Sequence, residues 1–121
     1  MVLVDTSVWI SHFRHGEPKL STLLSNRAVL CHPFVIGELA CGSMANRGHI
    51  LLFLEQLRSA VRATDEEALT FIEANRLMSK GIGYIDVHLL VSAALSDAPI
   101  WTRDRSLRAV ASALGLAYMT E

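Results

Sequence analysis

The feature that most constrains the fold is a short apolar run that is interrupted by an acid. Val2, Leu3 and Val4 are followed directly by Asp5. An unbroken run of branched apolar residues is typical of a strand that is buried on both faces, as strands are in a parallel sheet. Asp5 therefore stands where a central strand passes into the next element, and open α/β sheets bind their ligands at this end of the strands.

The residues after Asp5 also allow a purely structural role for its carboxylate. Thr6 and Ser7 are residue types that commonly cap helices, and the spacing of apolar residues predicts a short helix over 8–13. Asp5 fits this pattern as a helix cap. The stretch alone leaves the cap and the ligand-binding interpretation open.

The composition predicts a single, well-buried domain over residues 1–121. The chain has 121 residues, of which 51% are hydrophobic and 19% are charged, enough for one sizeable core but not for two. A net charge of −1 offers no general attraction for nucleic acid, so such a partner would need a local basic patch or metal ions. No apolar stretch reaches the roughly 18 residues that span a bilayer. We expect a cytoplasmic protein with no membrane contact, in which Cys31 and Cys41 are free, buried thiols.

Apolar periodicity predicts strands that alternate with helices. The predicted strands cover residues 2–4, 28–31, 59–62, 100–101 and 116–119. The predicted helices cover residues 8–13, a segment that begins at Pro18, 34–42, 49–57, a capped segment from Thr64 to Lys80, 87–95 and 107–114. This alternation indicates βαβ crossovers and a mostly parallel, layered α/β sheet.

Four acids lie where this pattern could bring them to one edge of the sheet. Asp5 and Asp104 follow predicted strands. Glu38 and Asp86 belong to the two most apolar helices, and we expect the helix of Glu38 to be largely buried. Carboxylates that lie close together repel one another unless a cation binds between them, and hard oxygen ligands suit Mg²⁺ or Mn²⁺. Independent helix caps and surface acids are the competing interpretation.

Other polar residues have simpler roles. Thr6, Ser7 and Thr102 carry hydroxyl groups that could orient the carboxylates of a metal site. Thr64 and Glu67 form a capping box, and the acids at 65–67 suit a helix N-terminus, so they receive no chemical role. The histidines lack metal-ligand spacing and are expected to be structural or exposed: His12, His15, His32, His49 and His88.

Four stretches give the chain a family resemblance. They are Val-Asp-Thr-Ser-Val-Trp-Ile at 4–10, Val-Ile-Gly-Glu-Leu-Ala-Cys-Gly at 35–42, Gly-Tyr-Ile-Asp at 83–86 and Trp-Thr-Arg-Asp-Arg-Ser-Leu at 101–107. In this order they resemble the PIN-domain ribonucleases that form the toxin half of VapBC-type toxin–antitoxin pairs. The four stretches together are specific, and the resemblance spans the whole chain.

The resemblance implies a three-layer α/β/α fold and an Mg²⁺- or Mn²⁺-dependent endoribonuclease acting on structured RNA such as tRNA or rRNA. By position, it implies a catalytic and metal-binding set of Asp5, Glu38, Asp86 and Asp104, with Asp5 and Asp86 as the firmest ligands. Glu38 and Asp104 would bind metal directly or through water, and Thr102 matches the hydroxyl position of the family. The resemblance also implies a VapB-type antitoxin, a homodimer and a toxin–antitoxin hetero-oligomer.

Substrate contacts are open to two interpretations. Arg103, Arg105 and Arg108 flank Asp104 and are candidates for contacts to RNA phosphates, but they equally fit the exposed face of a helix.

Three other classes of protein compete with the nuclease. A catalytically inactive PIN-fold binding module would show no stabilisation by Mn²⁺, whereas a metal-dependent nuclease would show a raised melting temperature. A phosphatase with an aspartate nucleophile would need a second aspartate at the position of Ser7. A phosphoryl-receiver module would need a lysine after a late strand, and the last lysine of the chain is Lys80.

Overall fold

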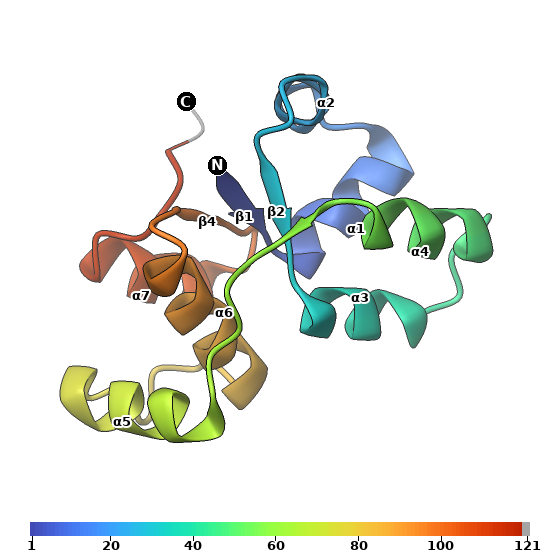
Figure 1. The fold of residues 1–121 in the computed structure, drawn as a ribbon. Coiled ribbons are helices and arrows are strands. Elements are labelled where there is room, and N and C mark those ends of the chain that lie inside the picture. Colours follow the sequence, from blue (N-terminus) through green and yellow to red (C-terminus); the bar gives the residue numbers. More distant parts are fainter. Residues whose placement is uncertain (120–121) are drawn as a thin grey trace.

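The computed structural model describes residues 1–119, which form four short strands and seven helices. The strands are β1 (Val2–Val4), β2 (Val29–Cys31), β3 (Arg58–Ser59) and β4 (Ile100–Trp101). The helices are α1 (Thr6–His15), α2 (Pro18–Ser25), α3 (Pro33–Ala40), α4 (Arg47–Glu55), α5 (Asp65–Asn75), α6 (Tyr84–Leu95) and α7 (Arg105–Ala113). Figure 1 shows α1, α3 and α4 on one side of the sheet and α5, α6 and α7 on the other. The predicted three-layer α/β/α fold is therefore confirmed.

The sheet is parallel throughout and has the strand order β3-β2-β1-β4. The chain builds β1, β2 and β3 in one direction and then returns to place β4 on the other side of β1. This reversal makes the space beyond β1 and β4 the topological switch point, where open α/β sheets bind ligands. Val4 is paired with Trp101, and the Asp5 N–H donates to the Trp101 carbonyl at 2.9 Å, so Asp5 and Thr102 leave the sheet side by side.

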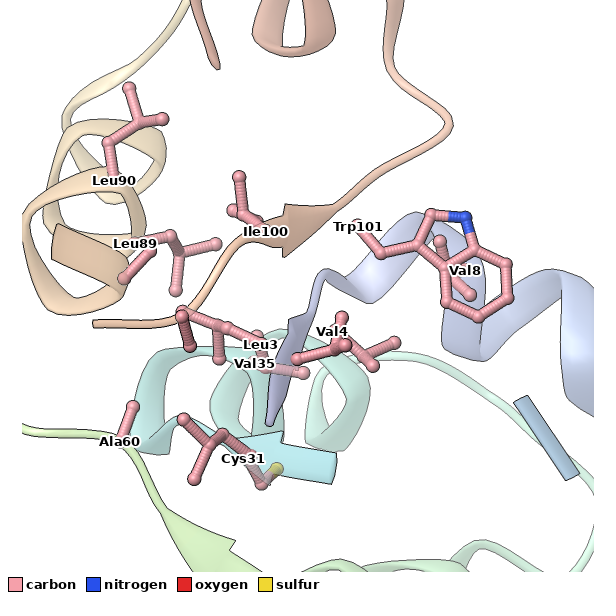
Figure 2. Close-up of a cluster of buried hydrophobic side chains, with 14 of the residues drawn as sticks. Leu3, Val4, Val8, Cys31, Val35, Ala60, Leu89, Leu90, Ile100 and Trp101 are labelled. Atoms are coloured by element: carbon pink, nitrogen blue, oxygen red, sulfur yellow. The ribbon is translucent and has the colours of Figure 1, made fainter. Parts of the chain in front are cut away.

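The core surrounds β1, whose three residues are all buried. Figure 2 shows Leu3 of this strand among side chains from both helical layers, including Val8, Val35 and Leu89. These four side chains are fully buried, and burial of each contributes about 1.5–3 kcal/mol to the free energy of folding. The predicted apolar helix is confirmed as α6, which is buried continuously from Val87 to Ala93. Within residues 1–119 no helix is both long and apolar enough to cross a bilayer.

Several predicted element ends were wrong. The helix expected to reach Lys80 ends at Asn75, because Arg76 adopts the left-handed conformation (φ 52°) and ends it without a glycine. The third strand comprises Arg58–Ser59 rather than residues 59–62. In place of a fifth strand at 116–119, Ala117 forms an isolated parallel bridge with Ile100.

The expectation of a largely buried α3 was also wrong. Val35 and Leu39 are buried on one face of α3, whereas Gly37 and Glu38 are exposed on the other. Because this helix consists mostly of small and apolar residues, its sequence does not distinguish the buried face from the exposed one. Cys41, expected to be buried, is exposed. Cys31 is buried as expected, and burial raises the pKa of its thiol to about 11.

Candidate acidic active site

Asp5 both caps a helix and organises the switch point. It is the N-cap residue of α1, with its carboxylate accepting from the Ser7 N–H at 3.4 Å. The same oxygen, Oδ2, accepts from the hydroxyl groups of Ser7 and Thr102, each at 2.7 Å. Asp5 is only 6% exposed, so these bonds hold the carboxylate in one orientation at the end of β1. The helix-cap interpretation of Asp5 is therefore confirmed, and the ligand-binding interpretation stays a prediction.

The end of β4 is tied to the same network. Thr102 Oγ1 accepts from the Asp104 N–H at 3.0 Å, and Ser7 Oγ accepts from the Arg103 N–H at 2.9 Å. Asp104 is exposed and caps α7 by accepting from the Leu107 N–H at 2.9 Å. The hydroxyl groups of Ser7 and Thr102 therefore fix both acidic strand ends relative to one another.

The remaining two acids reach the site from opposite helical layers. Glu38 lies on the exposed face of α3, where its Oε1 accepts from the Thr6 hydroxyl at 2.5 Å. Asp86 is half-buried in the first turn of α6, and its Oδ2 accepts from the Gly83 N–H at 3.1 Å. Each acid thus has a local hydrogen bond that restricts its carboxylate.

The charges of the other three acids act on Asp86. Burial is the main cause that raises the pKa of the Asp86 carboxyl, and the Gly83 N–H opposes it. The negative charges of Asp5, Asp104 and Glu38 raise this pKa further. Neither of the two ion pairs formed within residues 1–119 includes any of the four acids. The site is therefore a concentration of negative charge that the described side chains do not neutralise, and we call it the acidic quartet.

The donor set of the quartet fits a hydrated divalent cation. Carboxylate and hydroxyl oxygens suit Mg²⁺ or Mn²⁺, and Mg²⁺ usually takes one or two carboxylates while keeping several waters. Among residues 1–119, no three Asp, Glu, His or Cys side chains are arranged to hold a metal ion by themselves. An ion at this site would therefore draw part of its coordination from water and substrate.

The three candidate arginines do not form one patch. Arg103 Nη1 lies 3.0 Å from Glu17 Oε2, which also accepts from the Ser11 hydroxyl at 2.6 Å. This ion pair ties the segment next to Asp104 to the beginning of α2. Arg105 and Arg108 are exposed and line separate cavities of about 460 and 350 Å³.

A second polar cluster at this edge was missed at the level of sequence. Asp65 Oδ1 accepts from the Tyr84 hydroxyl at 2.7 Å and from His88 Nε2 at 3.0 Å. These bonds, the one from Tyr84 first, lower the pKa of the Asp65 carboxyl. The role given to Asp65 from the sequence, a favourable charge at a helix N-terminus, was therefore incomplete, because its carboxylate also joins α5 to α6. Contacts over 19 and 23 residues leave no local pattern that could have revealed them.

His32 is the buried member of the same region. Its Nδ1 accepts from the Phe34 N–H at 3.0 Å and caps α3, so the ring proton lies on Nε2, which donates to Ser92 Oγ at 3.1 Å. Burial is the main cause that lowers the pKa of His32 to about 4, with Arg62 and His88 adding to it. The Phe34 ring contacts both histidine rings, with centroids 5.1 Å apart in each case. We call Asp65, Tyr84, His88, His32 and Ser92 the paired cluster.

Comparison with known proteins identifies the family. The PIN domain model matches residues 2–113, and the chain belongs to the PIN-domain family. Within that family it is of the VapC type. Ribonuclease VapC32 of Mycobacterium tuberculosis, in strains CDC 1551 / Oshkosh and ATCC 25618 / H37Rv, is 42% identical over 122 residues. These alignments cover 100% of this chain and 98% of each relative.

A solved structure supports the fold independently. The crystal structure of PAE2754 from Pyrobaculum aerophilum superimposes with a TM-score of 0.59 over 90% of this chain and 78% of that one. At 16% sequence identity, this likeness concerns the fold alone.

Proposed function

We propose that this protein is a divalent-metal-dependent endoribonuclease of the VapC type that cleaves phosphodiester bonds in structured RNA, with tRNA or rRNA as the expected substrates. The observation that carries the proposal is the acidic quartet at the switch point, where burial and three neighbouring charges raise the pKa of Asp86. The name of the Mycobacterium tuberculosis relatives, Ribonuclease VapC32, supports the same activity.

The acids of the site would bind the metal ion, and the neighbouring hydroxyl groups would orient them. Asp5 and Asp86 would hold Mg²⁺ or Mn²⁺, with Glu38 and Asp104 binding it directly or through water. When bound, such an ion lowers the pKa of water and stabilises the charge that develops during displacement at phosphorus. The hydroxyl groups that donate to the carboxylates would keep them oriented, namely those of Thr6, Ser7 and Thr102. Cleavage would leave 5′-phosphate and 3′-hydroxyl ends.

The wider assembly follows from the VapC type. We propose a cognate VapB-type antitoxin, a homodimer and a toxin–antitoxin hetero-oligomer built on one domain over residues 1–121. A basic side chain of the antitoxin placed at the acidic quartet would neutralise it and so block the enzyme. The cytoplasmic location expected from the sequence stays a prediction.

The test compares two Asp→Asn variants that remove the same charge at the same edge of the sheet. Structured RNA is incubated with the wild type, Asp5→Asn and Asp65→Asn, each with Mn²⁺ and with a chelator. We expect Asp5→Asn to lower the cleavage rate by about three orders of magnitude, equivalent to ~4 kcal/mol of transition-state stabilisation. Asp65→Asn should retain cleavage, because the amide oxygen still accepts from Tyr84 and His88.

Three outcomes of this experiment would contradict the proposed function. A fully active Asp5→Asn protein would contradict the assignment of the site, and cleavage that persists in the chelator would contradict metal dependence. A folded wild type that never cleaves and is not stabilised by Mn²⁺ would favour the catalytically inactive binding module instead.

A further inference from the structure

We propose that Lys80, Arg105 and Ser106 form a binding site for a backbone phosphate of the RNA, next to the acidic quartet. The inference rests on the proposed function and adds a defined substrate contact to it. The three residues line a cavity of about 460 Å³ between α7 and the segment that precedes α6. Its remaining wall is largely apolar, with Leu77, Val110 and Leu114 among the lining residues.

The two cations lie close in sequence to two of the four acids, Asp86 and Asp104. Arg105 directly follows Asp104. Lys80 lies three positions before Gly83, and the Gly83 N–H donates to Asp86. A strand of RNA whose scissile phosphate lies at the quartet would thus have neighbouring phosphates within reach of this cavity. The chemistry fits, because a guanidinium, an ammonium and a hydroxyl group all donate to phosphate oxygens.

The segment that carries Lys80 is seated closely against α7. Gly81 has a φ of +79°, and a Cβ atom at this position would lie 3.0 Å from Ser106 Oγ. A side chain at this position would strain the left-handed backbone and crowd the Ser106 hydroxyl. This close approach places Lys80, the preceding residue, beside the first turn of α7, where Arg105 and Ser106 lie.

The negative charge of the molecule means that RNA binding requires a local group of cations. The chain has a net charge of −1, and the acidic quartet concentrates negative charge where an RNA phosphate must approach. Local cations are needed to offset this repulsion. Arg103 is engaged by Glu17, whereas neither Lys80 nor Arg105 forms an ion pair within residues 1–119. These two cations are therefore free to bind phosphate.

A second cavity of the same volume provides a matched control. It also measures about 460 Å³ and is lined by two cations, Arg27 and Arg58. Arg27 precedes β2, and Arg58 is the first residue of β3, so both lie at the opposite edge of the sheet from the quartet. Replacing this pair changes the net charge equally without affecting the surroundings of the acids.

The experiment measures RNA binding rather than cleavage. In an Asp5→Asn background, the affinity for a short fluorescein-labelled single-stranded RNA is measured by anisotropy between about 50 and 200 mM salt. We expect Lys80→Gln/Arg105→Gln to bind about tenfold more weakly at the lowest salt and to reduce the slope of log K against log salt by about 0.7, the value for one lost phosphate contact. Arg27→Gln/Arg58→Gln should keep the parent slope. Thermal unfolding confirms that all variants are folded.

The outcomes separate this inference from the proposed function. Equal slopes in the parent and Lys80→Gln/Arg105→Gln, with a wild type that cleaves RNA, overturn the phosphate site and leave the nuclease intact. A reduction of the same size in both double variants also overturns it, because net charge would then explain the effect. A parent with no salt-dependent RNA binding overturns the phosphate site, and a wild type that cleaves no RNA overturns the nuclease.

Discussion

The acidic quartet and the paired cluster lie at the same edge of the sheet but treat charge in opposite ways. In the quartet, burial and three neighbouring carboxylates raise the pKa of Asp86. In the paired cluster, hydrogen bonds from Tyr84 and His88 lower the pKa of Asp65, and His32 finds Ser92 as its partner. The Asp65 carboxylate thereby joins α5 to α6 through two hydrogen bonds. No ion pair within residues 1–119 includes an acid of the quartet, and this difference is why the proposed function gives the chemistry to the quartet, whereas the paired cluster joins α5 to α6.

The largest effect expected for the paired cluster is a loss of stability in acid. His32 has a pKa of about 4 in the folded protein, against an ordinary value of 6.5, so the unfolded chain binds the proton more tightly. The free energy of unfolding is therefore highest above about pH 6.5, where His32 is neutral in both states. It decreases by about 3 kcal/mol in all as the pH falls towards 4. Urea unfolding at several pH values between 7 and 4 measures this loss.

A matched variant isolates the contribution of His32. His32→Asn keeps a side-chain acceptor for the Phe34 N–H at the N-cap of α3 but removes the titrating ring. Its stability should therefore fall less between pH 7 and 4 than that of the wild type. Parallel losses in the two proteins would show that other groups cause the acid sensitivity.

A smaller effect is expected for metal binding to the quartet. Calorimetry with Mn²⁺ on the wild type and Asp86→Asn should show at least tenfold weaker binding in the variant, about 1.4 kcal/mol, because one carboxylate ligand is lost. Mn²⁺ should also raise the melting temperature of the wild type by mass action. Asp65→Asn should bind Mn²⁺ like the wild type, since the charge of Asp65 is not among those that act on Asp86. Equal binding in the wild type and Asp86→Asn would return Asp86 to the role of a helix-terminal anion.

The parts of the fold that the sequence predicts are those with a local signal. The apolar run of β1 and the apolar helix α6 report their own burial, and the capping box at Thr64 and Glu67 forms as expected, with bonds of 2.8 and 3.0 Å. The alternation of strands and helices is sufficient to predict a parallel sheet. Asp5 could be singled out because it ends a buried strand.

The parts that could not be predicted depend on tertiary packing. α5 ends because Arg76 adopts the left-handed conformation, and an arginine in the sequence does not predict that conformation. The two faces of α3 become distinct only when one of them packs against other elements. The hydrogen bonds from Tyr84 and His88 to Asp65 join two helices, and the apolar periodicity of the sequence does not predict how these helices are placed relative to one another.

The smallest effect sharpens the comparison within the quartet itself. Thr6→Val removes the hydroxyl that donates to Glu38 at the solvent-exposed face of α3, where water can replace it. Thr102→Val removes a buried hydroxyl that bonds both Asp5 and the Asp104 N–H. We expect kcat/KM on structured RNA to fall only two- to fivefold in Thr6→Val, about 0.5–1 kcal/mol, and further in Thr102→Val. The reverse order would mean that the orientation of Glu38, rather than that of Asp5, limits the activity of the site.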